Sequence, residues 1–215
     1  MSLSESLLDS VNDNLDLLRS LGINYSNVEP QLYASLEDEN FVRLFIKENN
    51  LTDNDFVAII HPFAGYQSKN WQEDKFAELI RVLFNRYNAR IILVGSAKDK
   101  EAGEDIIRMS KVPAINLAGK TSLGELTYLF KKMNVFIGVD SGPAHIAALT
   151  KKPTVIIYSG TNRPEEWAPA GEQVVVIRKD VECGYCEKLN CKDNICMKMI
   201  SVEDVLGAIR QAAGI

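Results

Sequence analysis

The strongest chemical signal in the sequence lies in residues 135–148, which spell VFIGVDSGPAHIAA. The β-branched and aromatic start predicts a buried strand, and Asp140, Ser141 and Gly142 then form a short polar turn before an apolar helix. Backbone N–H groups at a helix start have no helical acceptor, so they suit a phosphate or diphosphate. We therefore predict an anion-binding site at this turn, with His145 one turn into the helix on the same side. The alternative is that Asp140 or Ser141 only caps the helix.

A second signal lies in residues 61–71, HPFAGYQSKNW, at the end of another apolar run. Lys69 is placed to meet phosphate oxygens, although a lysine beside a tryptophan is as often a solvated residue next to a core anchor. Both histidines of the chain, His61 and His145, lie close to the ends of predicted strands. Ligands of parallel sheets bind at that edge, so the joint placement of the two rings favours a functional role.

Two further motifs are contradicted by the sequence around them, and a third is absent where it would be needed. Residues 114–121 end in GKT like a nucleoside-triphosphate loop, but the first glycine is missing and the segment predicts a strand. Residues 138–142 resemble a nucleophile elbow with Asp140 as the nucleophile, but no histidine follows His145 as the hydrolase order demands. No GxGxxG follows a predicted strand, so nicotinamide or flavin chemistry is disfavoured. We predict no cofactor.

Four cysteines lie close together near the end of the chain, namely Cys183, Cys186, Cys191 and Cys196. One interpretation is a tetrathiolate zinc site, but the second pair is separated by four residues where a zinc knuckle usually has two. The other interpretation is a set of thiols that helps to fold a loop. We therefore predict no metal centre.

The elements that must position these residues alternate from residue 56 onward, with short β-branched runs between amphipathic segments. This alternation is typical of strands and crossover helices that build a parallel sheet. Six strands are predicted, at residues 56–60, 90–94, 114–117, 135–139, 154–158 and 174–177. Apolar residues at helical spacing predict three covering helices, within residues 76–87, 123–130 and 202–209. The predicted fold class is α/β, a Rossmann-like domain of three layers with a roughly six-stranded parallel sheet.

Residues 1–55 differ from the rest, because they carry 11 acidic and 3 basic side chains and predict helices at 7–18 and 41–46. We interpret residues 1–55 as a helical inter-domain lead-in and residues 56–215 as the binding domain. The later part carries 18 acidic and 21 basic side chains, a balance that suits a small anionic ligand. Nucleic acid would need clustered Lys and Arg. The sequence has no apolar run near ~18 residues and no signal-peptide pattern, so we expect a cytoplasmic location.

The combined motifs resemble glycosyltransferase family 9, which includes the ADP-heptose:lipopolysaccharide heptosyltransferases. The similarity rests on HPFAG and KNW within residues 61–71, on LAGKTSLGEL at 117–126 and on VDSGPAHIAA at 139–148. It covers about residues 56–212 and includes the cysteine cluster. The family folds as two Rossmann-like domains that face a cleft, the GT-B type, and its carboxyl-terminal domain holds the nucleotide-sugar donor. The resemblance implies that this chain is that carboxyl-terminal half.

The resemblance also implies roles for five residues of the two strongest motifs. Asp140, Ser141, Gly142 and His145 match the signature that embraces the pyrophosphate and sugar of the donor. Lys69 matches the lysine near the phosphates.

Two acidic residues past the second predicted strand are weaker matches. Glu101 lies where the family places the acid that binds the ribose, and Glu104 is a neighbouring candidate. Relatives also carry an amino-terminal domain that binds the acceptor and supplies the catalytic base. Residues 1–55 resemble the inter-domain segment and not that domain, so we expect the base to lie outside this chain and assign no catalytic residue within it.

The function implied by the resemblance is donor binding in an enzyme that transfers heptose from ADP-heptose to the lipopolysaccharide inner core. The implied partners are the nucleotide-sugar donor and, through the amino-terminal domain, the lipopolysaccharide acceptor. The full enzyme would associate peripherally with the inner face of the inner membrane. Two alternatives stay open: a stand-alone nucleotide-binding module without transferase activity, and a hydrolase with Asp140 as nucleophile.

Overall fold

The computed structural model describes residues 15–23, 30–169 and 171–215. Its centre is a sheet of six strands in the order β3-β2-β1-β4-β5-β6, and every neighbouring pair is parallel. The strands are β1 (Val57–His61), β2 (Arg90–Leu93), β3 (Ile115–Asn116), β4 (Val135–Val139), β5 (Thr154–Ile157) and β6 (Val174–Ile177). The predicted α/β class and parallel sheet are confirmed, and each strand end lies within one residue of its predicted position.

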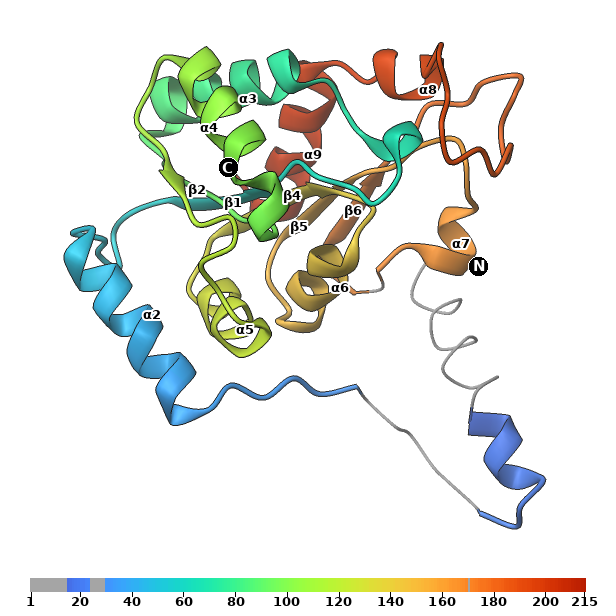
Figure 1. Cartoon of the computed structure of the whole chain (residues 1–215), viewed down its shortest axis with the longest axis horizontal. Helices are drawn as coiled ribbons and strands as arrows, with labels where there is room; N and C mark the ends of the chain where they lie inside the picture. Colours follow the sequence, from blue (N-terminus) through green and yellow to red (C-terminus); the bar gives the residue numbers. More distant parts are fainter. Residues whose placement is uncertain (1–14, 24–29, 170) are drawn as a thin grey trace.

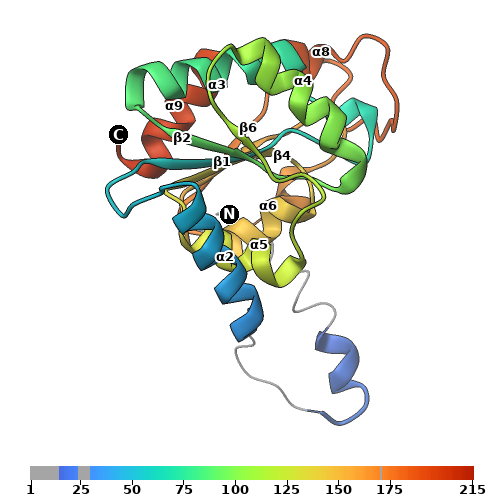
Figure 2. The same cartoon turned by 60° about the vertical axis from the view of Figure 1, so that its left-hand side comes forward.

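Helices cover both faces of this sheet. The helices are α2 (Leu36–Glu48), α3 (Glu73–Tyr87), α4 (Lys100–Ser110), α5 (Leu123–Lys131), α6 (Gly142–Leu149), α7 (Pro164–Trp167), α8 (Ile195–Lys198) and α9 (Val202–Ala213), with 3-10 turns η1 (Gln67–Lys69) and η2 (Ala97–Asp99). Figures 1 and 2 show α3, α4 and α9 on one face and α2, α5 and α6 on the other. The three predicted layers are therefore present.

Alternating side chains of the strands form two separate cores. In β1, Ala58 and Ile60 pack on the side of α3 and α9, whereas Val57 and Ile59 pack on the side of α2 and α5. Every residue of β1 and β4 is buried, as expected for central strands of a parallel sheet. These two covered strands form a rigid base for the segments that follow their carboxyl ends.

Helix α2 packs against α5 and belongs to the second core. Val42 and Phe45 are the buried side chains of α2, and the predicted helix 41–46 lies within this element. The acidic first part of the chain therefore contributes to the packing of the domain.

One carboxylate joins the starts of α2 and α5. Asp38 accepts a hydrogen bond from the backbone N–H of Ser35 at 2.8 Å and from Oγ of Ser122 at 2.9 Å. Ser122 also forms the predicted capping box with Glu125. A side chain at Gly124 would collide with Asp38, so this glycine permits the close approach of the two helices.

One expectation about the helices is wrong, and another lies mostly outside the described residues. Leu123 is 73% exposed, because it stands at the first position of α5, before the buried stripe that includes Leu126 begins. The predicted helix 7–18 lies mostly outside the described residues, and its described part is helical over residues 15–18. No helix within the described ranges is long and apolar enough to cross a membrane.

Candidate functional site

The strand order places the candidate site at a reversal within the sheet. From β1 the chain continues to β2 and β3 on one side, and from β4 it continues to β5 and β6 on the other. β1 and β4 are neighbours, with His61 level with Gly138. The helices that follow them, α3 and α6, cover opposite faces of the sheet. Ligands of open α/β sheets bind at such a switch point, outside the carboxyl ends of the strands.

Lys69 and Asp140 form an ion pair across the switch point. Nζ of Lys69 lies 2.5 Å from Oδ2 of Asp140, and the two side chains are 15% and 7% exposed. Each charge is therefore compensated mainly by the other. Trp71 anchors the chain after Lys69, because its buried indole donates to the carbonyl of Ile200 at 3.0 Å. Trp71 is thus the core anchor that the sequence allowed, whereas Lys69 is paired and largely buried instead of solvated.

Ser141 does not cap helix α6, although it occupies the N-cap position. Its hydroxyl lies 3.0 Å from Nδ1 of His61 and 3.0 Å from the carbonyl oxygen of Val139. Because His61 ends β1 and Ser141 follows β4, this contact fixes the turn to the neighbouring strand. The capping alternative is wrong for Ser141, since no backbone N–H of the helix donates to its side chain.

The turn after β4 leaves two backbone donors open. The N–H groups of Ser141 and Gly142 have no acceptor among the described residues. Pro143 has no N–H, and that of Ala144 donates to the carbonyl of Ser141 at 3.1 Å. A methyl group added to Gly142 would meet no atom within 4 Å. The site offers fewer amides than a full helix start, but they stand at the positive end of the helix dipole and next to open space.

His145 lies in the electrostatic field of the ion pair. Burial lowers the pKa of its imidazole, the Asp140 carboxylate acts in the opposite direction, and the Lys69 ammonium lowers the pKa further. The ring is therefore neutral at pH 7, with one nitrogen able to donate a hydrogen bond and the other able to accept one. Lys69, Asp140, Ser141, Gly142 and His145 thus gather at one place, as the sequence predicts.

His61 is a site residue whose partner the sequence did not reveal. It is 6% exposed, and burial lowers the pKa of its imidazole to about 4, against a weak opposing effect of Asp99. A neutral ring can accept or donate at Nδ1, and it holds the Ser141 hydroxyl. The available signal was its position at the end of the strand beside β4, which becomes visible only once the strand order is known.

Glu101 and Glu104 are not brought to this cluster. Glu101 is exposed in the first turn of α4 and makes no hydrogen bond or ion pair with the gathered side chains. Glu104 accepts from Nδ2 of Asn116 at 3.0 Å, which joins α4 to β3. The ribose-binding role of either acid stays a prediction.

The four cysteines carry free thiols. Across the described ranges, no three His, Cys, Asp or Glu side chains are arranged to hold a metal ion. Cys196 is buried in the first core, whereas Cys183 is exposed. Cys183, Cys186 and Cys191 lie in the segment between β6 and α8, and Cys196 lies in α8 itself.

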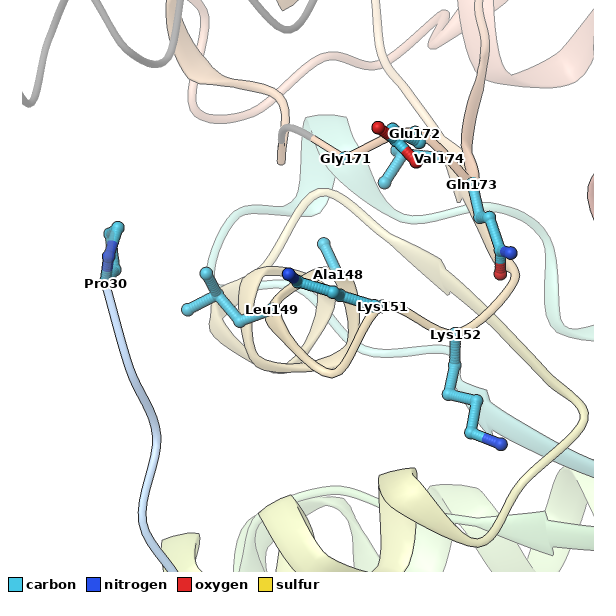
Figure 3. Close-up of a pocket in the computed structure, with 9 residues that line it drawn as sticks. All are labelled: Pro30, Ala148, Leu149, Lys151, Lys152, Gly171, Glu172, Gln173 and Val174. Carbon is cyan, nitrogen blue, oxygen red and sulfur yellow. The ribbon is translucent and has the colours of Figure 1, made fainter. Parts of the chain in front are cut away.

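Several cavities in the described part of the chain lie away from the gathered side chains. One cavity of about 280 Å³ is bordered by Leu149, Lys151 and Val174, at the amino-terminal ends of β5 and β6 (Figure 3). Figure 3 shows Lys151 and Lys152 pointing in different directions, with Pro30 across a wide gap. Polar groups do not converge there, so it is a weaker candidate for a ligand site than the switch point.

The fold and the open amides define the chain as a Rossmann-like α/β domain with its candidate site at the switch point. It belongs to glycosyltransferase family 9 (heptosyltransferase), whose family model matches residues 4–196.

Individual relatives agree with this membership. The chain is 29% identical over 205 residues to lipopolysaccharide heptosyltransferase 3 of Escherichia coli K12, covering 92% of this chain and 58% of the relative. It is similar in structure to the glycosyl transferase family 9 protein from Veillonella parvula, with a TM-score of 0.78, 23% identity and coverage of 93% and 58%. For E. coli ADP-heptose lps heptosyltransferase II the TM-score is 0.71 at 25% identity, with coverage of 89% and 55%. The chain therefore spans little more than half the length of these relatives.

Proposed function

We propose that this chain is the donor-binding part of a glycosyltransferase that transfers heptose from ADP-heptose to the lipopolysaccharide inner core. The observation that carries the proposal is the pair of open amides at Ser141 and Gly142 beside the Lys69–Asp140 ion pair. The names of the relatives support the sugar and the acceptor, because they are lipopolysaccharide heptosyltransferases and one is named for ADP-heptose. These names favour a transferase over a stand-alone nucleotide-binding module and over an Asp140 hydrolase.

The open amides and the helix dipole would hold the diphosphate of the donor. Negative charge gathers on the diphosphate as the glycosidic bond breaks, so donors aimed at it stabilise the transition state more than the ground state. The neutral imidazole of His145 can donate a further hydrogen bond to the departing phosphate. These groups act on the leaving group and not on the incoming nucleophile.

Lys69 would supply the positive charge for the same diphosphate. In the structure its ammonium is already oriented by Asp140, so little side-chain freedom is lost when an anion arrives. Asp140 itself would repel a phosphate oxygen, and its carboxylate suits the hydroxyl groups of the sugar, from which it can accept hydrogen bonds. The ion pair thus offers the Lys69 ammonium to the diphosphate of the donor and the Asp140 carboxylate to its sugar.

Acceptor binding and the general base belong, in this proposal, to the remainder of a longer enzyme. That enzyme would work in the cytoplasm, at the inner face of the inner membrane where its acceptor is assembled. We expect the 215-residue chain to bind the donor and to transfer almost no sugar. Transfer at a normal rate by this chain alone would contradict the assignment of the base to another domain.

Titration calorimetry with ADP and ADP-heptose tests the proposal. Gly142→Ala places a methyl group in the open space before the amides without touching any protein atom, so we expect a loss of affinity of about 10-fold. The matched control is Gly207→Ala in α9, where the added methyl group would meet only the Arg210 side chain, at 3.9 Å. The control should bind ADP as the unchanged chain does. Absence of ADP binding by the unchanged chain, or full affinity in Gly142→Ala, would overturn the proposal.

A further inference from the structure

The segment of residues 181–194, here called the cysteine loop, connects β6 with α8. It contains Cys183, Cys186 and Cys191. In Figure 1 it is the orange-red loop beside the teal turn η1. β6 and β1 lie on opposite sides of β4 in the sheet. The loop thus starts near the end of β6 and reaches the segment that follows β1.

One end of the cysteine loop is fixed to the segment that follows β5. The backbone N–H of Tyr185 donates to the carbonyl of Gly160 at 2.6 Å, and that of Glu187 donates to Thr161 at 3.1 Å. The Tyr185 ring also lies 5.2 Å from the guanidinium of Arg163 and 4.4 Å from that of Arg178. Cation–π contacts of this kind add to the two hydrogen bonds. This end of the loop is therefore well anchored.

The other end of the cysteine loop holds the residues on both sides of Lys69. The backbone N–H of Ser68 donates to the carbonyl of Leu189 at 3.2 Å, and Oε1 of Gln67 accepts from the N–H of Cys191 at 2.9 Å. After Lys69, the carbonyl of Asn70 accepts from Nδ2 of Asn194 at 3.2 Å. The Lys69 side chain donates a hydrogen bond to Asp140, and these three contacts fix the backbone from which that side chain extends.

Asn194 has the position and the support to orient this backbone. It is 7% exposed and adopts a left-handed conformation with φ of 40°, which Asn tolerates better than most residues. Its N–H donates to Sγ of Cys191 at 3.3 Å, and its Oδ1 accepts from Sγ of Cys196 at 3.8 Å. With Oδ1 engaged by a thiol, Nδ2 is left to point at Asn70.

We infer that Asn194 is a positioning residue of the donor site, which acts through the 66–70 segment to hold Lys69 against Asp140. The inference rests on the proposed function for its effect on donor binding. It also gives two of the four cysteines a role that needs no metal. Sγ of Cys191 accepts from the backbone N–H of Asn194, and the thiol of Cys196 donates to its side-chain Oδ1. The four thiols then need not meet at one point.

Hydrogen–deuterium exchange of the ligand-free chain tests the positioning itself. Asn194→Gly removes the amide and keeps a residue that adopts the left-handed conformation freely. We expect the amides of residues 66–70 to exchange about 5-fold faster or more, because local opening there loses a hydrogen bond. Asn190→Gly, an exposed asparagine of the same loop, is the matched control and should leave these rates unchanged. Unchanged exchange in Asn194→Gly overturns the inference, whatever the chain binds.

A double-mutant cycle with ADP separates positioning from general damage. Asn194→Gly should weaken ADP binding about 5-fold in the unchanged chain and have little effect in the Lys69→Ala background, because residues that act through one another are not additive. An equal loss in both backgrounds would overturn the inference. If Asn194→Gly fails to fold, Asn194→Asp takes its place, because it keeps the size of the side chain and a residue type that tolerates the left-handed conformation but removes the Nδ2 donor. Faster exchange without any ADP binding by the unchanged chain would reject the proposed function and retain the positioning.

Discussion

The imidazole of His61 and the hydroxyl of Ser141 lie 3.0 Å apart, although 80 residues separate them in the sequence. The contact links the end of β1 to the turn after β4. Because the Ser141 side chain is engaged by His61, it does not fold back onto the helix start, and the amides of Ser141 and Gly142 stay open. The buried, neutral His61 thus keeps the Ser141 hydroxyl away from the backbone N–H groups of the candidate phosphate site.

The Lys69–Asp140 pair should contribute to stability as well as to binding. Lys69→Ala leaves a carboxylate that is 7% exposed without its cation, and we expect the free energy of unfolding to fall by about 2–4 kcal/mol. The variant should also bind ADP at least about 10-fold more weakly. Urea unfolding and titration calorimetry measure the two effects.

The double variant Lys69→Ala/Asp140→Asn is the control for this prediction. Replacing the stranded carboxylate by a neutral amide should return part of the lost stability without returning ADP affinity. A double variant no more stable than Lys69→Ala would show that the Asp140 charge is not the source of the loss.

Stability should depend on pH through His61. Its pKa is about 4 in the folded chain and about 6.5 when unfolded. The unfolded state therefore binds more protons between these values, and stability that is complete above pH 6.5 is lost as the pH falls towards 4. The loss from this group is about 3 kcal/mol, and His145 adds to it in the same direction because its pKa is also lowered.

His61→Gln isolates this contribution. Urea unfolding at pH 7.5, 5.5 and 4.5 should show a shallower decline for the variant than for the unchanged chain. Parallel declines would mean that the pKa of His61 is the same in the folded and unfolded states, contrary to the effect of its burial.

Two serines at helix starts should behave in opposite ways. Ser122 accepts from the N–H of Glu125 at 3.1 Å, so Ser122→Ala should cost about 1 kcal/mol of stability and leave ADP binding intact. Ser141 accepts no such bond, so Ser141→Ala should cost less than about 1 kcal/mol and weaken ADP binding several-fold through the freed turn. Thermal unfolding and calorimetry on both variants compare them directly, and a reversed pattern would assign Ser141 to capping.

The sequence was sufficient for the sheet and for half of the site. Central parallel strands are apolar on both faces, so β4 could be located to the residue at 135–139, and the β-branched run of the edge strand β6 located it equally well at 174–177. The turn at 140–142 was visible because its polar residues interrupt a strand and a helix that are otherwise apolar. Local patterns of this kind need no knowledge of the fold.

The remaining relationships depend on which strands become neighbours. Lys69 and Asp140 are 71 residues apart, and neither their residue types nor their spacing predicts that they form an ion pair. Glu101 illustrates the same dependence, because it follows β2 in the sequence but lies exposed in the first turn of α4, and its ribose-binding role stays a prediction. The clustering of the cysteines left a zinc site and a folded loop open from sequence alone, and the contacts of Cys191, through its backbone N–H and its sulfur, became visible only in the structure.

Asp38 fixes the direction from which the chain enters the domain. By joining Ser35 to Ser122, it holds the beginning of α2 beside the connection that leaves the carboxyl end of β3, where Gly119 is bonded to Gly95 after β2. The segment that precedes Ser35 therefore meets the domain at the edge of the sheet that also carries the open amides of Ser141 and Gly142.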